Sequence, residues 1–127
     1  MTAGPAILLV EDEAVNRALL RAVLGRHPRL RDARLVEAPS LAEARGELAR
    51  STFDLVVLDI RLPDGDGLDL ARELSSTDPR PRILVLSANI QEERRHQATA
   101  AGADAFMGKP YRPGELGAAM EELLGTT

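Results

Sequence analysis

The chain has 127 residues, enough for one domain with a single hydrophobic core. We therefore expect residues 1–127 to form one domain, with its core over about residues 5–124 and no separate output domain. Its net charge is −4 and its arginines are spread along the chain, which argues against nucleic acid as a partner. The absence of cysteine excludes disulfides and thiolate metal sites, and the absence of a signal peptide or membrane span predicts a cytoplasmic protein that does not bind membranes.

Short apolar runs alternate along the chain with amphipathic stretches, a pattern typical of βαβ units around a parallel sheet. Each run is almost continuously apolar, as expected for a strand that is buried on both faces. We expect strands at residues 6–10, 33–37, 55–58, 82–86 and 105–107. The fold class is therefore α/β.

The segments between these runs have the spacing of helices with one buried face. The first helix should end near Gly25, and its expected buried face consists of Val15, Leu19, Leu20, Val23 and Leu24. Ser40 and Glu43 form a capping-box pattern at the start of a second helix. A third helix should begin near Gly67, and Pro113 suits the first turn of the last one.

The fourth expected helix, over residues 91–101, differs from the others. It offers nothing larger than alanine to the core, so we expect it to be weakly anchored and mobile, with Gly102 as its C-cap. The adjacent Arg94 and Arg95 are interpreted as a solvated face or, as a second choice, a surface for a partner.

Polar side chains follow the expected strands at their carboxyl ends, where open parallel sheets bind ligands. These residues are Glu11, Asp12 and Glu13 after the first strand, Asp59 after the third, Ser87 after the fourth and Lys109 after the fifth. Carboxylates held close together need a cation, and oxygen ligands favour Mg²⁺. Asp59 is then the candidate nucleophile, because carboxylates can accept phosphoryl groups.

Lys109 is the only lysine in the chain. Its compact ammonium could contact both a carboxylate and a phosphoryl oxygen, and the Ser87 hydroxyl could donate to the same group. Pro110 follows Lys109, and the sequence leaves open whether the peptide bond between them is cis.

The same residues also have purely structural interpretations. An acidic run such as 11–13 is often a solvated helix start, Ser87 could be a cap, and Phe106 could be core. Asp64, Asp66 and Asp69 are interpreted as turn and N-cap residues, and His27 and His96 as exposed residues without a catalytic role.

Several segments, in order and at their spacing, resemble the response-regulator receiver domains of two-component signalling. These segments are residues 7–13, 58–63, 66–67, 86–88, 102–106 and 109–110, so the resemblance covers nearly the whole chain. It implies a flavodoxin-like, doubly wound (βα)5 fold with five parallel strands in the order 2-1-3-4-5. Asn16 and Arg17 resemble receivers attached to hybrid kinases, while stand-alone, chemotaxis-regulator-like receivers are the other type considered.

By this resemblance, Asp59 accepts a phosphoryl group from a histidine kinase or a histidine phosphotransfer protein, and the domain assists its own phosphorylation and dephosphorylation without a separate substrate. The implied Mg²⁺ ligands are Asp12 and Asp59 directly, Glu11 through water, and the backbone carbonyl of Arg61. Ser87 and Lys109 would hold the phosphoryl group.

The resemblance also implies a switch. A shift of Ser87 toward the phosphoryl group would be coupled to inward rotation of Phe106, and the face formed by the fourth helix, fifth strand and fifth helix would then bind a downstream protein differently. Phe106 lacks the hydroxyl of the tyrosine often found there, so only its ring could report phosphorylation. Arg61 and Asn89 occupy positions that vary in the family, so the phosphoryl lifetime is open, as is the choice between a monomer and a phosphorylation-dependent dimer.

Two other functions are alternatives. A magnesium phosphatase of the haloacid-dehalogenase kind would place its nucleophile in an Asp-x-Asp pair after the first strand, whereas the acceptor here follows the third. A receiver-like scaffold that works without phosphorylation usually lacks the acceptor, an acidic ligand or the lysine, and this chain keeps all three. Both remain as minor alternatives.

Overall fold

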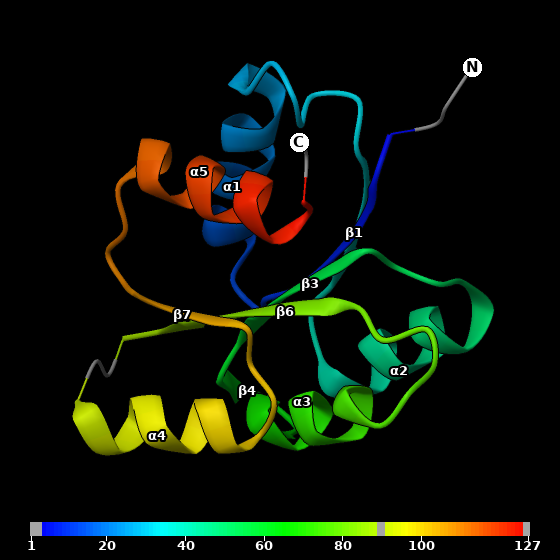
Figure 1. Cartoon of the computed structure of the whole chain (residues 1–127), viewed down its shortest axis with the longest axis vertical. Helices are drawn as coiled ribbons and strands as arrows, with labels where there is room; N and C mark the ends of the chain where they lie inside the picture. The colour runs from blue at the N-terminus through cyan, green and yellow to red at the C-terminus, as the bar shows by residue number, and fades with distance from the viewer. Residues whose placement is uncertain (1–3, 89–90, 126–127) are drawn as a thin grey trace.

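The computed structural model describes residues 4–88 and 91–125, and its main sheet has five parallel strands in the order β2-β1-β3-β6-β7. The strands are β1 (Ala6–Val10), β2 (Arg34–Ala38), β3 (Leu55–Asp59), β6 (Arg82–Ser87) and β7 (Ala105–Gly108). Counted alone, these five have the order 2-1-3-4-5, which confirms the predicted α/β doubly wound fold. In Figure 1 the sheet lies between two layers of helices.

The five helices of the described chain are α1 (Ala14–Arg26), α2 (Leu41–Arg50), α3 (Gly67–Ser75), α4 (Glu92–Ala100) and α5 (Pro113–Leu123). Helices α1 and α5 cover one face of the sheet, and α2, α3 and α4 cover the other (Figure 1). Each face has its own apolar cluster, because strand side chains alternate between the two faces. For example, Leu8 and Val56 belong to one cluster, and Ile7 and Leu55 to the other.

Strand pairing brings the site residues to one edge. Val10 is in register with Leu58, Asp59 with Leu86, and Ser87 with Gly108. Since all these strands are parallel, their carboxyl ends meet at the same edge of the sheet.

The predicted helix boundaries are confirmed by their caps. The Ser40 hydroxyl accepts a hydrogen bond from the Glu43 N–H at 3.2 Å, and the Asp66 carboxylate accepts one from the Leu68 N–H at 2.8 Å. Pro113 is the first residue of α5. Local capping chemistry therefore fixes where these helices begin.

One prediction about α1 is wrong. Val15 is 77% exposed and Leu19 is 42% exposed, whereas Leu20, Val23 and Leu24 are buried as predicted. Val15 and Leu19 lie four positions apart on a side of α1 that stays exposed, and Leu19 lines a hollow beside Pro113 and Gly114 at the start of α5.

The structure also differs from prediction at two smaller features. A short antiparallel hairpin, β4 (Arg61–Leu62) with β5 (Gly65–Asp66), follows β3 and was not predicted, because strands of two residues carry no hydrophobic period. His27 is partly buried rather than exposed, since its Nε2 lies 3.0 Å from Glu121 Oε2 on α5.

Helix α4 contributes little to the core, as predicted. Among the described residues of α4, Ala98 alone is buried, and Ala101 just beyond its end is buried as well. Gly102 then has a φ of +101°, a conformation suited to the glycine predicted there as a C-cap.

The two faces of α1 provide a test of the packing. Leu20 is fully buried, so Leu20→Ala should lower the free energy of unfolding by about 2–5 kcal/mol, because it removes apolar contacts and leaves a cavity. Val15→Ala should change it by no more than about 0.5 kcal/mol, because Val15 is exposed. Urea denaturation of both variants measures the two values, and equal losses would contradict this description of α1.

Candidate functional site

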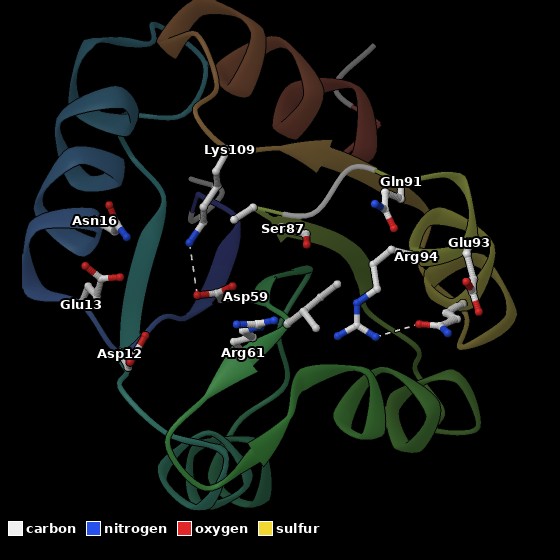
Figure 2. Close-up of a pocket in the computed structure, with 13 residues that line it drawn as sticks. Asp12, Glu13, Asn16, Asp59, Arg61, Ser87, Gln91, Glu93, Arg94 and Lys109 are labelled. Carbon is white, nitrogen blue, oxygen red and sulfur yellow. Dashed lines mark hydrogen bonds and ion pairs between the residues drawn. The ribbon is translucent and has the colours of Figure 1, made fainter.

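A pocket of about 700 Å³ opens at the carboxyl edge of the sheet, between the start of α1 and helix α4. Its walls include five residues predicted for the site, namely Asp12, Asp59, Arg61, Ser87 and Lys109. Figure 2 shows these side chains gathered around Asp59, although they come from four different strand ends. The structure therefore brings together residues that lie up to 98 positions apart in the case of Glu11 and Lys109.

Lys109 connects two buried carboxylates. Its Nζ lies 2.8 Å from Glu11 Oε2 and 3.1 Å from Asp59 Oδ2. Glu11 is 2% exposed and Asp59 is 9% exposed, so these ion pairs are largely shielded from water. The backbone N–H of Lys109 also donates to the carbonyl of Ser87 at 2.8 Å, which fixes the residue at the end of β6. Lys109 is thus held in place both through its ammonium and through its backbone N–H.

The three charged groups shift one another's pKa values. Burial raises the pKa of Asp59, and the neighbouring Glu11 charge raises it further, while Lys109 offsets only part of this. Burial also opposes ionisation of Glu11, but hydrogen bonds from Lys109 and from the Glu13 N–H outweigh it and lower the Glu11 pKa. Burial likewise disfavours the Lys109 ammonium, yet its contacts with Glu11 and Asp59 raise the Lys109 pKa. Asp59 is therefore the carboxylate that the fold stabilises least in its charged form.

The acidic loop after β1 has the donor set of a divalent cation site. Carboxylate oxygens of Glu11, Asp12 and Glu13 all lie within 4.8 Å of one another, with Glu11 buried and the other two exposed. Oxygen donors at such spacing fit Mg²⁺. Glu13 belongs to this cluster although it was not a predicted ligand; its place in the acidic run was the signal in the sequence.

Part of this loop is already engaged by the protein. Glu11 Oε1 accepts from the Glu13 N–H at 3.2 Å and from Asn16 Nδ2 at 3.4 Å, and its other oxygen contacts Lys109. Arg17 Nη1 donates to the backbone carbonyls of Glu11 and Asp12 at 3.0 and 3.1 Å. The exposed carboxylates of Asp12 and Glu13 are thus the ones presented to the solvent.

Gly67 allows the chain to close tightly behind Asp59. Its N–H donates to the Ile60 carbonyl at 2.6 Å, and a Cβ at this position would lie 2.2 Å from the Asp59 carbonyl oxygen. No side chain fits at that distance, so only glycine can hold the start of α3 against the end of β3.

The residues predicted for a switch lie on adjacent strands. Ser87 is buried at the end of β6 and lines the pocket, while Phe106 on β7 is partly buried against the core cluster that includes Ala98. The guanidinium of Arg95 lies over the Phe106 ring, 4.9 Å from its centroid.

Asn89, which was predicted to flank the pocket, lies outside the described residues. The Lys109–Pro110 peptide bond, left open by the sequence, is cis.

Helix α4 supplies pocket residues that the sequence interpretation missed. Arg94 and Gln97 line the pocket, although Arg94 was interpreted as solvated or as part of a partner surface. The signal was present in the spacing, because Arg94 stands four positions before the buried Ala98 and therefore shares its inward face.

Comparisons with known proteins support a common family. The sequence model for the response regulator receiver domain matches residues 7–121. The KDP operon transcriptional regulatory protein KdpE of Escherichia coli (strain K12) is 38% identical over 118 residues, which cover 93% of this chain and 50% of KdpE. The chemotaxis protein CheY of Halobacterium salinarum is 31% identical, covering 93% of this chain and 95% of CheY.

Solved structures agree. The crystal structure of a two-component response regulator of the LuxR family from Aurantimonas sp. SI85-9A1 superposes with a TM-score of 0.85 at 30% identity, covering 97% of this chain and 86% of that one.

This chain covers nearly all of CheY but only part of KdpE. The chain spans about half the length of KdpE, whose name describes transcriptional regulation. The prediction that nucleic acid is not a partner therefore concerns these 127 residues alone. Within the described residues, no helix is long and apolar enough to cross a membrane.

The raised pKa of Asp59 predicts how stability depends on pH without Mg²⁺. The folded state binds the Asp59 proton more tightly than the unfolded chain, so ionisation of Asp59 destabilises the fold. This loss is complete above the folded-state pKa of Asp59, and it disappears as the pH falls from there to the lower pKa of the unfolded chain. Asp59→Asn should therefore raise the free energy of unfolding at neutral pH, with the difference from wild type narrowing at acidic pH. Denaturant melts across the pH range in EDTA measure it.

Asp64 is a control of opposite sign. Its carboxylate accepts the N–H groups of Leu41 and Ala42 at 2.9 and 3.0 Å, and these bonds lower its pKa. Asp64→Asn should therefore destabilise the protein at neutral pH, and this loss should shrink as the pH falls. If Asp59→Asn behaved like Asp64→Asn, the opposite electrostatic environments assigned to the two carboxylates would be contradicted.

Proposed function

The chain belongs to the response regulator receiver domain family, and from this membership we propose that it is a phosphorylation-dependent signalling switch whose acceptor is Asp59. Members of the family are phosphoacceptor domains of two-component systems. The observation that carries the proposal for this chain is the position of Lys109, whose ammonium contacts both Asp59 and Glu11 at the base of an open pocket.

The proposed donor is the phosphohistidine of a histidine kinase or of a histidine phosphotransfer protein. In the transfer, the N–P bond breaks and its electron pair stays on the histidine nitrogen, while one Asp59 carboxylate oxygen forms the new O–P bond. Asp59 reaches the pocket at the end of β3, so a donor can approach it from the solvent side. The domain would assist its own phosphorylation and dephosphorylation, without a separate substrate.

Lys109 and Ser87 are the groups that would hold the transferred phosphoryl oxygens. Both line the pocket beside Asp59, and Figure 2 shows them on the same side of it. The ammonium supplies charge and the hydroxyl a hydrogen bond, and both favour the negative charge on the phosphoryl oxygens.

We assign Mg²⁺ to the acidic side of the pocket, with Asp12 and Asp59 as direct ligands, Glu11 acting through water and the Arg61 carbonyl as a further ligand. The clustering of Glu11, Asp12 and Glu13 supports this assignment and adds Glu13 as a candidate. Bound Mg²⁺ would neutralise the charge on the phosphoryl oxygens during transfer.

The proposed output is a change in the face formed by α4, β7 and α5, which would alter binding of a downstream protein or lead to a phosphorylation-dependent dimer. Ser87 would respond to the phosphoryl group, and the Phe106 ring would respond to Ser87. The sparse packing of α4 supports this, because switch elements come from weakly anchored parts of a fold.

Incubation with acetyl phosphate and Mg²⁺, followed by intact-mass measurement, tests the proposal. The wild type should gain one phosphoryl adduct that hydroxylamine removes, because an acyl phosphate is hydroxylamine-labile. Asp59→Asn should gain none, and EDTA should prevent the adduct in the wild type.

Asp69→Asn is a matched control, since Asp69 is an exposed aspartate on α3 that pairs with Arg72 outside the pocket. This variant should be phosphorylated like the wild type. A folded wild type that gained no adduct would contradict the proposal and favour a scaffold that works without phosphorylation.

A further inference from the structure

Two consecutive arginines on α4 are not used by the proposed function. Arg94 lines the pocket, and its side chain is only 24% exposed. Arg95, the next residue, lies over the Phe106 ring. One helix therefore carries a cation toward the acceptor and a second cation onto the aromatic of the proposed switch. Figure 2 shows Arg94 entering the pocket from α4, on the side opposite Asn16.

The contacts that hold Arg94 are weaker than those that hold Lys109. Its Nη2 lies 3.9 Å from Asp66 Oδ2, which is at the limit of an ion pair, and Asp66 itself is 43% exposed. Its Nη1 donates to Gln97 Oε1 at 2.7 Å, within the same helix. An ion pair at this distance whose acidic partner is open to solvent contributes little, so a stronger anion in the pocket could displace Asp66.

Phosphorylation would supply that anion. An ionised Asp59 carries about one negative charge and a phosphoryl group about two, so the pocket would gain roughly one. Lys109 is already bound to Glu11 and Asp59. Arg94 stands on another wall of the pocket, and its planar guanidinium can bind two phosphoryl oxygens at once.

A displacement of Arg94 would be transmitted through α4. Among the described residues of this helix Ala98 alone is buried, so the core resists its movement only weakly. Because Arg95 directly follows Arg94, a shift of this turn would carry the guanidinium that lies 4.9 Å from the Phe106 ring centroid. A cation held over an aromatic face favours one arrangement of the ring.

We propose that Arg94 is a second phosphoryl-binding cation that draws α4 toward phosphorylated Asp59, and that Arg95 conveys this movement to the Phe106 ring. The inference rests on the proposed function, since it requires a phosphoryl group on Asp59. It assigns to two arginines the coupling that a tyrosine hydroxyl could not provide here, because residue 106 is phenylalanine.

Beryllofluoride, a stable phosphoryl mimic, allows binding and coupling to be measured separately. It would be titrated in the presence of Mg²⁺ into protein with labelled lysine and phenylalanine, with the NMR signal of the Lys109 amide reporting binding and that of the Phe106 ring reporting the switch. Arg94→Gln should bind about tenfold more weakly, the scale of one charged hydrogen bond, and at saturation should show a reduced ring shift. Arg94→Lys, which keeps the charge, should bind more tightly than Arg94→Gln.

Arg95→Gln should bind beryllofluoride like the wild type, while the shift of its Phe106 ring at saturation is reduced. Arg50→Gln is the matched control, because Arg50 is 74% exposed at the end of α2, and this variant should match the wild type in both signals. Wild-type affinity together with a full ring shift in Arg94→Gln would overturn the inference and leave the acceptor role of Asp59 intact. If wild-type protein, shown to be folded, failed to bind beryllofluoride, both the proposed function and this inference would be rejected.

Discussion

The burial of Glu11, Asp59 and Lys109 in one linked group is the constraint on which the rest of the site depends. Charged groups this poorly exposed are costly unless each has a partner, and here a single ammonium serves both carboxylates. The three residues lie at the carboxyl ends of β1, β3 and β7, so they meet only if these strands are in register and the sheet has its observed order. The strand register that forms the core therefore also assembles the site, because a slipped strand would leave a buried charge without its partner.

The same linkage sets the electrostatics of Asp59, the proposed acceptor. At Glu11, burial is outweighed by hydrogen bonds from Lys109, the Glu13 N–H and Asn16, which lower the pKa, whereas at Asp59 burial and the Glu11 charge outweigh Lys109 and raise the pKa. A carboxylate with an incompletely compensated charge, beside a cation and an open pocket, is suited to take on a group that brings its own charge-balancing contacts. The firmly held Lys109 and the loosely held Arg94 then have different tasks in our account, since one organises the site before phosphorylation and the other responds to it.

Much of the fold and of the candidate site could be predicted from the sequence. Continuous apolar runs identify buried parallel strands, and Ser40 and Pro113 mark helix starts through local chemistry. What was missed depends on tertiary position. Val15 and Leu19 fit the helical period but lie on a side of α1 that stays exposed, and His27 becomes partly buried because α5 packs on α1. The spacing of Arg94 four positions before Ala98 places it on the inward face of α4, but that this face borders the pocket depends on where α4 lies.

The central claim is that Asp59, and no other carboxylate of this acidic pocket, accepts the phosphoryl group. Borohydride reduces an aspartyl phosphate to homoserine and leaves free carboxylates unchanged, so peptide mapping after acetyl phosphate and borohydride treatment identifies the acceptor directly. Our account predicts homoserine at position 59 alone, in a peptide distinct from the one that carries Glu11, Asp12 and Glu13. Modification within residues 11–13, or at any other acidic residue in place of Asp59, would contradict it.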